Sequence, residues 1–177
     1  MIHLKDKTFE TFIRKEEISN KIDDLTSAIN ADFKGQEVIF IAILNGSFMF
    51  AADLMKKINL DCEISFIKVS SYVGTSSTGR VDEIIGLNTS IANKNVVIIE
   101  DVVDTGITMD KVISLLGNEK PLSLKTCTLL YKEEAFKGKN VPHYVGFNIP
   151  NKFVVGYGLD YDEKGRNLNE IYQLKEN

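Results

Sequence analysis

Residues 96–108 read VVIIEDVVDTGIT, and this stretch decides the fold. Its four β-branched residues predict a buried strand. Carboxylates follow at Glu100, Asp101 and Asp104, and a Thr-Gly-x-Thr turn over 105–108 opens a helical pattern. Carboxylates at a strand end are costly to desolvate unless a cation or hydroxyl meets them, whereas backbone N–H groups before a helix bind phosphate. An acidic cradle beside an anion cradle suits a sugar phosphate with Mg²⁺.

Strands and helices alternate on both sides of this stretch. Helices are predicted at residues 14–33, 48–58 and 108–116, and strands at 37–43, 62–69, 84–87, 96–100, 122–131, 153–157 and 171–174. This order predicts an α/β fold with a mainly parallel, twisted sheet flanked by helices. Ligands of such sheets bind at the carboxyl ends of the strands, where residues 100–108 lie. Residues 70–82, rich in Ser, Thr and Gly, predict a long functional loop.

Length and composition indicate an ordinary soluble domain. The 177 residues fit one domain, and no apolar run approaches the roughly 18 residues of a membrane span. The first 15 residues lack the apolar core of a signal peptide. The net charge of −4 disfavours broad nucleic-acid binding. Cys62 and Cys127 lie in strand-like runs and are predicted to be buried free thiols in a reducing cytoplasm.

Other readings of the acidic motif fit less well. Two acidic residues after a strand are often a helix cap or a solvated strand end, but three with a Thr-Gly-x-Thr turn are less often so. Neither a G-x-x-x-x-G-K-[ST] loop nor a G-x-G-x-x-G fingerprint occurs. Asp104-Thr105-Gly106 spells the aspartic protease tripeptide, but that tripeptide lies in all-β proteins and a helix follows here. A phosphorylation-receiver domain would need its acidic pair earlier in the chain.

Residues 100–108 resemble the motif that binds 5-phosphoribosyl-1-pyrophosphate (PRPP) in type I phosphoribosyltransferases. The resemblance runs from about residue 8 to the C-terminus. Further matching segments are the pyrophosphate loop at 44–47, the head of the flexible catalytic loop at Ser71 and Tyr72, the purine-side residues 131–132 and 152–161, and Arg166. The run from Phe153 to Tyr161 is similar to the 6-oxopurine branch of the family.

The resemblance implies one domain over residues 1–177, with a core at about 34–135. A small purine-side hood would form from the N-terminal segment and about 140–177. The implied reaction is purine salvage, in which the 5-phosphoribosyl group of PRPP is transferred to N9 of hypoxanthine, and of guanine, giving IMP or GMP and pyrophosphate. The family also implies a homodimer or homotetramer, with contacts around Asn45. No membrane or nucleic-acid partner is expected.

The resemblance also implies roles on the ribose-phosphate side. Glu100 and Asp101 would accept hydrogen bonds from the ribose hydroxyls and ligate Mg²⁺. Asp104 would be the catalytic residue, taking the N7 proton of the base as N9 attacks C1′. The 5′-phosphate would be held by backbone N–H groups of Asp104, Thr105, Gly106, Ile107 and Thr108 and by the two threonine hydroxyls.

On the purine side, the resemblance implies that Lys132 donates to the purine O6 and that Phe153 stacks on the base. The Val154 backbone would contact the edge of the base. Asp160 would help to bind the purine and hold a second Mg²⁺ at the pyrophosphate. Ser71 and Tyr72 would close over the site as part of a lid.

Asn45, Gly46 and Arg166 are implied to bind pyrophosphate, and Arg166 would neutralise its charge as a bidentate donor. Relatives commonly carry Lys or Arg where this chain has Asn45. The family's cis peptide would lie between Leu44 and Asn45. A second hypothesis is a PRPP-sensing regulator that binds nucleic acid, but the acidic charge balance disfavours it, and retention of the purine-side residues favours the enzyme.

Overall fold

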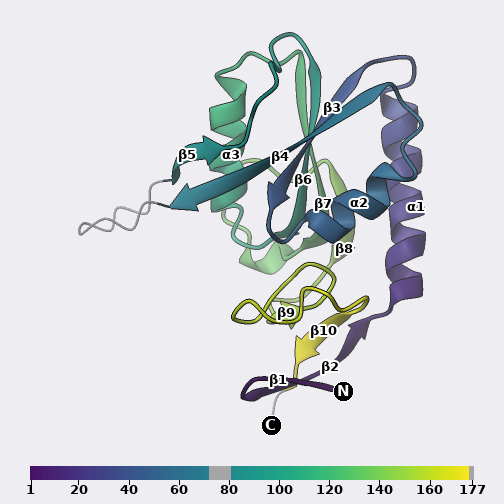
Figure 1. The fold of residues 1–177 in the computed structure, drawn as a ribbon, viewed down its shortest axis with the longest axis vertical. Coiled ribbons are helices and arrows are strands. Elements are labelled where there is room, and N and C mark those ends of the chain that lie inside the picture. The colour runs from purple at the N-terminus through teal and green to yellow at the C-terminus, as the bar shows by residue number, and fades with distance from the viewer. Residues whose placement is uncertain (72–80, 176–177) are drawn as a thin grey trace.

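The computed structural model describes residues 1–71 and 81–175, and most of them surround one large sheet (Figure 1). Within these residues the sheet has six strands in the order β5-β4-β3-β6-β7-β8. Their bounds are β3 (Val38–Leu44), β4 (Cys62–Ser71), β5 (Val81–Ile85), β6 (Asn95–Val103), β7 (Ser123–Tyr131) and β8 (Tyr144–Asn148). All neighbours pair in parallel except β5, which pairs antiparallel with β4. The predicted mainly parallel sheet is confirmed.

Helices cover both faces of this sheet (Figure 1). The helices α1 (Lys15–Asp32) and α2 (Phe48–Met55) lie on one face, and α3 (Ile107–Gly117) lies on the other. Alternate residues of β3 serve the two faces, because Phe40 packs in the layer with α1 and α2 whereas Ile41 packs in the layer with α3. A strand buried on both faces is a continuous apolar run, which explains its clear sequence signal.

A second, smaller sheet forms a hood beyond the larger one. Its strand order is β1-β2-β10-β9, and neighbouring strands are antiparallel. Its bounds are β1 (Ile2–Leu4), β2 (Lys7–Ile13), β9 (Val154–Val155) and β10 (Ile171–Leu174). The hood therefore brings the two ends of the chain together (Figure 1). The hood boundary at residue 140 needs correction, because β8 pairs with β7 in the larger sheet.

The strands around the motif are longer than the sequence indicates. Strand β6 continues through Glu100 and Asp101 to Val103, so the acidic pair lies within the strand and only Asp104 follows it. Neighbouring strands supply its backbone hydrogen bonds, which carry the pairing through polar residues. Ser71 pairs with Val81, so the ends of the predicted 70–82 loop are strand. Tyr72 and the rest of that predicted lid lie outside the described residues.

The remaining predictions concern the cysteines and the membrane. Both cysteines are free; Cys127 is buried as expected, whereas Cys62 is only half-buried at the start of β4. A short 3-10 helix, η1 (Glu133–Ala135), follows β7 and was not predicted. Within residues 1–71 and 81–175, no helix is both long and apolar enough to cross a membrane.

Candidate active site

The ends of three adjacent strands place the first site residues. Asn45, Asp104 and Lys132 each directly follow β3, β6 or β7, which lie side by side in the sheet. The register pairs the last residues of β6 and β7, so Asp104 and Lys132 emerge next to each other. Their side chains form an ion pair, with Lys132 Nζ 2.7 Å from Asp104 Oδ2. The lysine side chain is 9% exposed and the aspartate 46%, so the carboxylate faces open space.

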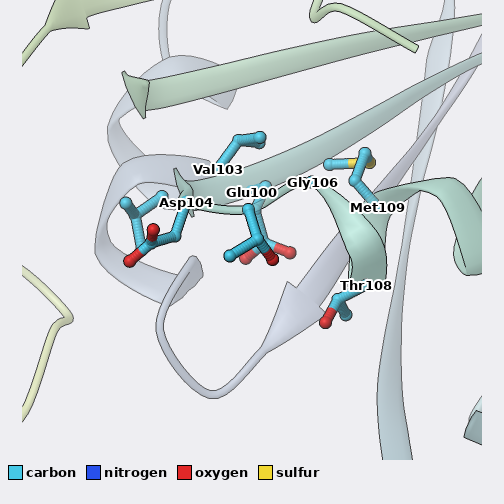
Figure 2. A pocket seen from close by; sticks show the side chains of 8 residues that line it. Glu100, Val103, Asp104, Gly106, Thr108 and Met109 are labelled. Carbon is cyan, nitrogen blue, oxygen red and sulfur yellow. The ribbon is translucent and has the colours of Figure 1, made fainter. Parts of the chain in front are cut away.

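A small cavity of about 100 Å³ lies over the turn between β6 and α3 (Figure 2). Its lining residues are Glu100, Val102, Val103, Asp104, Thr105, Gly106, Thr108 and Met109. Helix α3 begins after Gly106, so its first N–H groups have no intrahelical acceptor and can bind an anion. Gly106 has φ +79°, and a Cβ there would overlap the Phe136 ring. The Ile107 side chain is 50% exposed and does not line the cavity.

Glu100 and Asp101 are neighbouring carboxylates without a basic partner among the described residues. Desolvation and the neighbouring Asp101 charge raise the pKa of Glu100 well above its ordinary value. Backbone N–H groups partly satisfy both, since Asp101 N donates to Glu100 Oε1 at 3.1 Å and Val102 N donates to Asp101 Oδ1 at 2.9 Å. Among the described residues, neither carboxylate pairs with a lysine or arginine. A cation at this position would relieve their repulsion.

The donor set fits Mg²⁺ held jointly with a substrate. Over the described parts of the chain, no group of three or more His, Cys, Asp and Glu side chains could hold a metal by itself. Mg²⁺ commonly binds through one or two carboxylates together with substrate oxygens and waters. Glu100 and Asp101 offer such carboxylates beside the anion cradle.

A second cavity, of about 290 Å³, lies between the strand ends and the hood. It is lined by Asp101, Val102, Asp104, Lys132, Phe153, Val154, Leu159 and Asp160. The structure thus brings together the residues that the sequence assigned to the purine side. Phe153 is 45% exposed and meets Tyr161 edge-on at 5.8 Å between ring centroids, so it is not a core residue. Val102 was missed because an apolar side chain gives no chemical signal, and Leu159, within the matching segment 152–161, was assigned no role.

The predicted pyrophosphate loop packs directly against β6. Asn45 is exposed, and the peptide bond between Leu44 and Asn45 is cis, as the sequence resemblance implied. A Cβ added at Gly46 would overlap the Asp101 carboxylate, so only glycine allows this close approach. On the hood side, a Cβ at Gly158 would overlap the Gly46 carbonyl. The loop is therefore enclosed between β6 and the hood.

Arg166 and Asp160 are already paired with each other in the hood. Arg166 Nη2 lies 2.7 Å from Asp160 Oδ1, and Nη1 donates to the Gly158 carbonyl at 2.9 Å. The two opposite charges neutralise each other within the chain. Neither Arg166 nor Asn45 lines the two cavities described above, so the structure does not bring them onto the walls shared by Asp104 and Lys132.

Comparison with known proteins identifies a family whose sequences and structures are similar to this chain. The phosphoribosyl transferase domain family matches residues 12–162. A hypoxanthine-guanine phosphoribosyltransferase from Staphylococcus aureus is 44% identical over 167 residues, which cover 94% of this chain and 93% of the relative. A crystal structure of a hypoxanthine-guanine phosphoribosyltransferase from Bacillus anthracis superimposes with a TM-score of 0.86 at 40% identity, covering 96% of this chain and 99% of that one.

A more distant structure shows the same fold. A variant of the hypoxanthine phosphoribosyltransferase from Trypanosoma cruzi, solved as a ternary complex with substrates, has a TM-score of 0.87 at 36% identity and 97% coverage of both chains. Sequence and structure thus agree over nearly the full length. The chain belongs to the phosphoribosyltransferase family, in its hypoxanthine-guanine branch.

Proposed function

We propose that this transferase moves the 5-phosphoribosyl group of PRPP to N9 of hypoxanthine, and of guanine, giving IMP or GMP and pyrophosphate. One observation carries the proposal: Asp104 lines both the cavity at the helix α3 N-terminus and the cavity at the hood. A carboxylate there can reach a base in one cavity while a sugar phosphate occupies the other.

On the sugar side, the backbone N–H groups at the start of α3 bind the 5′-phosphate, and the Thr105 and Thr108 hydroxyls add donors. Glu100 and Asp101 accept hydrogen bonds from the ribose hydroxyls and hold Mg²⁺ together with them. When bound, Mg²⁺ supplies positive charge that stabilises departing pyrophosphate. Asp160 would hold a second ion, for which it must exchange its contact with Arg166.

At the base, Asp104 and Lys132 act as a pair. The Lys132 ammonium donates to the purine O6, which favours 6-oxo over 6-amino bases because an amino group offers no comparable acceptor. Asp104 accepts the N7 proton while N9 forms its bond to C1′ and the C1′–oxygen bond to pyrophosphate breaks. In the absence of a base, the Lys132 ammonium and the Asp104 carboxylate pair with each other, with 2.7 Å between Nζ and Oδ2. Phe153 stacks on the base and Val154 contacts its edge through the backbone.

An absorbance assay tests the reaction. With PRPP and Mg²⁺, we expect turnover of hypoxanthine and guanine, no turnover of adenine, and loss of activity when a chelator removes Mg²⁺. Nucleoside monophosphate and pyrophosphate should form in equal amounts. Tight PRPP binding without turnover of any purine would contradict the proposal and favour the PRPP-sensing regulator, whose nucleic-acid binding a filter assay with RNA would measure.

Lys132→Gln tests whether Lys132 recognises the O6 atom of the purine. We expect its KM for hypoxanthine to rise about tenfold, the loss of one charge-assisted hydrogen bond, and its preference for hypoxanthine over adenine to shrink. Lys94→Gln is the matched control, because Lys94 pairs with Glu37 at 2.6 Å at the opposite end of β6. Steady-state kinetics with both bases give the comparison. An unchanged base preference in Lys132→Gln would exclude the O6 contact.

The cellular context and assembly are part of the same proposal. We expect a cytoplasmic enzyme, in keeping with its two free cysteines. The homodimer or homotetramer implied by the family remains a prediction. Exposed apolar side chains at Phe48, three residues after Asn45, and at Phe66 on the neighbouring strand β4 support it, and light scattering would measure the molar mass.

A further inference from the structure

The hood segment after β9 has an unusual backbone. Gly156, Tyr157 and Gly158 follow one another with φ of +97°, +51° and +102°. A bulky aromatic residue rarely adopts a positive φ, and it does so only where its surroundings hold it there. Backbone hydrogen bonds contribute, since Tyr157 N donates to Leu168 O at 2.8 Å. The segment begins directly after Val154 and Val155, and Val154 lines the purine-side cavity.

The Tyr157 side chain leaves the hood and reaches the helix behind the pyrophosphate loop. Its hydroxyl donates to Asp53 Oδ2 on α2 at 2.6 Å, and Asp53 Oδ1 accepts from Lys56 Nζ at 2.8 Å. Tyr157 is buried. Burial and the Asp53 carboxylate raise the pKa of the phenol, so the hydroxyl keeps its proton and remains a donor. Helix α2 starts three residues after Asn45, so this hydrogen bond joins the hood to the loop through one short helix.

A second contact joins the same two parts. Gly158 lies against the Gly46 carbonyl, and Gly46 lies against the Asp101 carboxylate. The purine-contacting segment, the pyrophosphate loop and β6 are thus stacked in direct contact. A small rotation of the hood on α2 would move the purine-contacting segment relative to the pyrophosphate loop and β6.

Close packing leaves part of this junction open, although Tyr157 belongs to the same buried cluster as Ile18, Ile22 and Leu54 of the two helices. A cavity of about 250 Å³ lies between α1, α2 and the hood, and Tyr157 and Asp53 form part of its wall. Its other lining residues are Lys15, Ile18, Ser19, Ile22, Met49, Lys56, Lys57 and Asn169. Where side chains leave such a space, dispersion contacts constrain the two sides less. Beside this space, the directional hydrogen bond between Tyr157 and Asp53 acts together with the core packing to set the spacing of the hood and α2.

We propose that Tyr157 and Asp53 are positioning residues that hold the purine-contacting hood in register with the pyrophosphate loop. The inference rests on the proposed function, because it concerns how well that site binds its base. Neither side chain lines the two substrate cavities. Their hydrogen bond acts through Val154 on one side and Gly46 on the other.

Tyr157→Phe tests the proposal by removing one hydroxyl. We expect the KM for hypoxanthine at saturating PRPP to rise about fivefold to tenfold, while the Kd for PRPP alone changes less than twofold. Tyr144→Phe is the matched control: Tyr144 is also buried and donates to Asp32 Oδ2 at 2.6 Å, but it lies at the start of β8, near the opposite edge of the sheet. Both variants should lose similar thermal stability. Only Tyr157→Phe should change the KM for the base.

The acceptor gives an independent test. Asp53→Asn keeps an oxygen that can accept from Tyr157 and should retain a near-normal KM, whereas Asp53→Leu should behave like Tyr157→Phe. If Tyr157→Phe does not fold, the two Asp53 variants decide the matter. Equal KM values in Tyr157→Phe and Tyr144→Phe, or in the two Asp53 variants, would overturn the inference. Wild-type protein without purine turnover would instead count against the proposed function itself.

Discussion

Asp104→Asn is expected to lower kcat by about 10²- to 10³-fold, within the range that general acid–base catalysis commonly contributes. Asparagine has nearly the same shape and can still accept one hydrogen bond from Lys132, but it cannot accept a proton from N7 at neutral pH. The cradle at the start of α3 remains intact, because its N–H donors belong to the backbone. PRPP binding should therefore change by less than threefold.

The measurement is steady-state kinetics with hypoxanthine, together with calorimetric titration of PRPP. Asp23→Asn is the control, because Asp23 accepts from Lys57 at 2.7 Å on the α1 surface and so matches the Lys132–Asp104 distance. That variant should keep wild-type kcat. A kcat for Asp104→Asn within threefold of wild type would show that Asp104 is not the catalytic base. Electrostatic stabilisation of the charge that develops in the transition state would then be the main source of catalysis.

Gly46→Ala should weaken PRPP binding by about 100-fold, or roughly 2.7 kcal/mol. The Gly46 backbone lies outside the left-handed region, so alanine itself is conformationally acceptable there. Its Cβ, however, would overlap the Asp101 carboxylate. The loop cannot shift away from Asp101 toward the hood, because Gly158 already lies against the Gly46 carbonyl. Either the loop or the carboxylate must move, and both belong to the proposed PRPP site.

Gly117→Ala provides the matched control for this steric effect. Gly117 is the last residue of α3, and a Cβ there would meet nothing within 4 Å. We expect unchanged PRPP affinity and slightly higher thermal stability, because alanine favours the helix over glycine. PRPP affinity of Gly46→Ala equal to that of wild type would show that the loop can yield, and that its close contact with Asp101 is not needed for binding.

The central part of the fold was predictable because its signals are local. Runs such as 38–44 are apolar throughout, which marks strands buried on both faces, and α1 repeats its buried residues every three or four positions. Strand β2 was missed because Lys7–Ile13 mixes charged and apolar residues in the half-buried pattern of an outer sheet. Strand β8 was missed because its five residues include a glycine and an asparagine.

The sequence predicted which residues belong to the site but not how their side chains are arranged. The residue types around 100–108 indicate their chemistry, yet the Asp104–Lys132 contact depends on the register between β6 and β7, which no local pattern encodes. The Arg166–Asp160 pair likewise depends on a turn, because Asp162, Glu163 and Gly165 between them have positive φ and return the chain toward Asp160. The first contact joins residues 28 positions apart and the second depends on a turn, so both need the three-dimensional path of the chain.

The order of strands in the hood has a consequence for synthesis on the ribosome. Strand β2 pairs with β10, and the side chains of Glu10 and Gln173 meet although they are 163 positions apart. The six-stranded sheet draws only on residues 38–148 and can assemble earlier, with the phosphate cradle at the start of α3 already complete. The base-binding half closes only when β10 emerges, because pairing so distant in the chain must await its partner. A nascent chain thus gains its anion cradle before it can hold a purine.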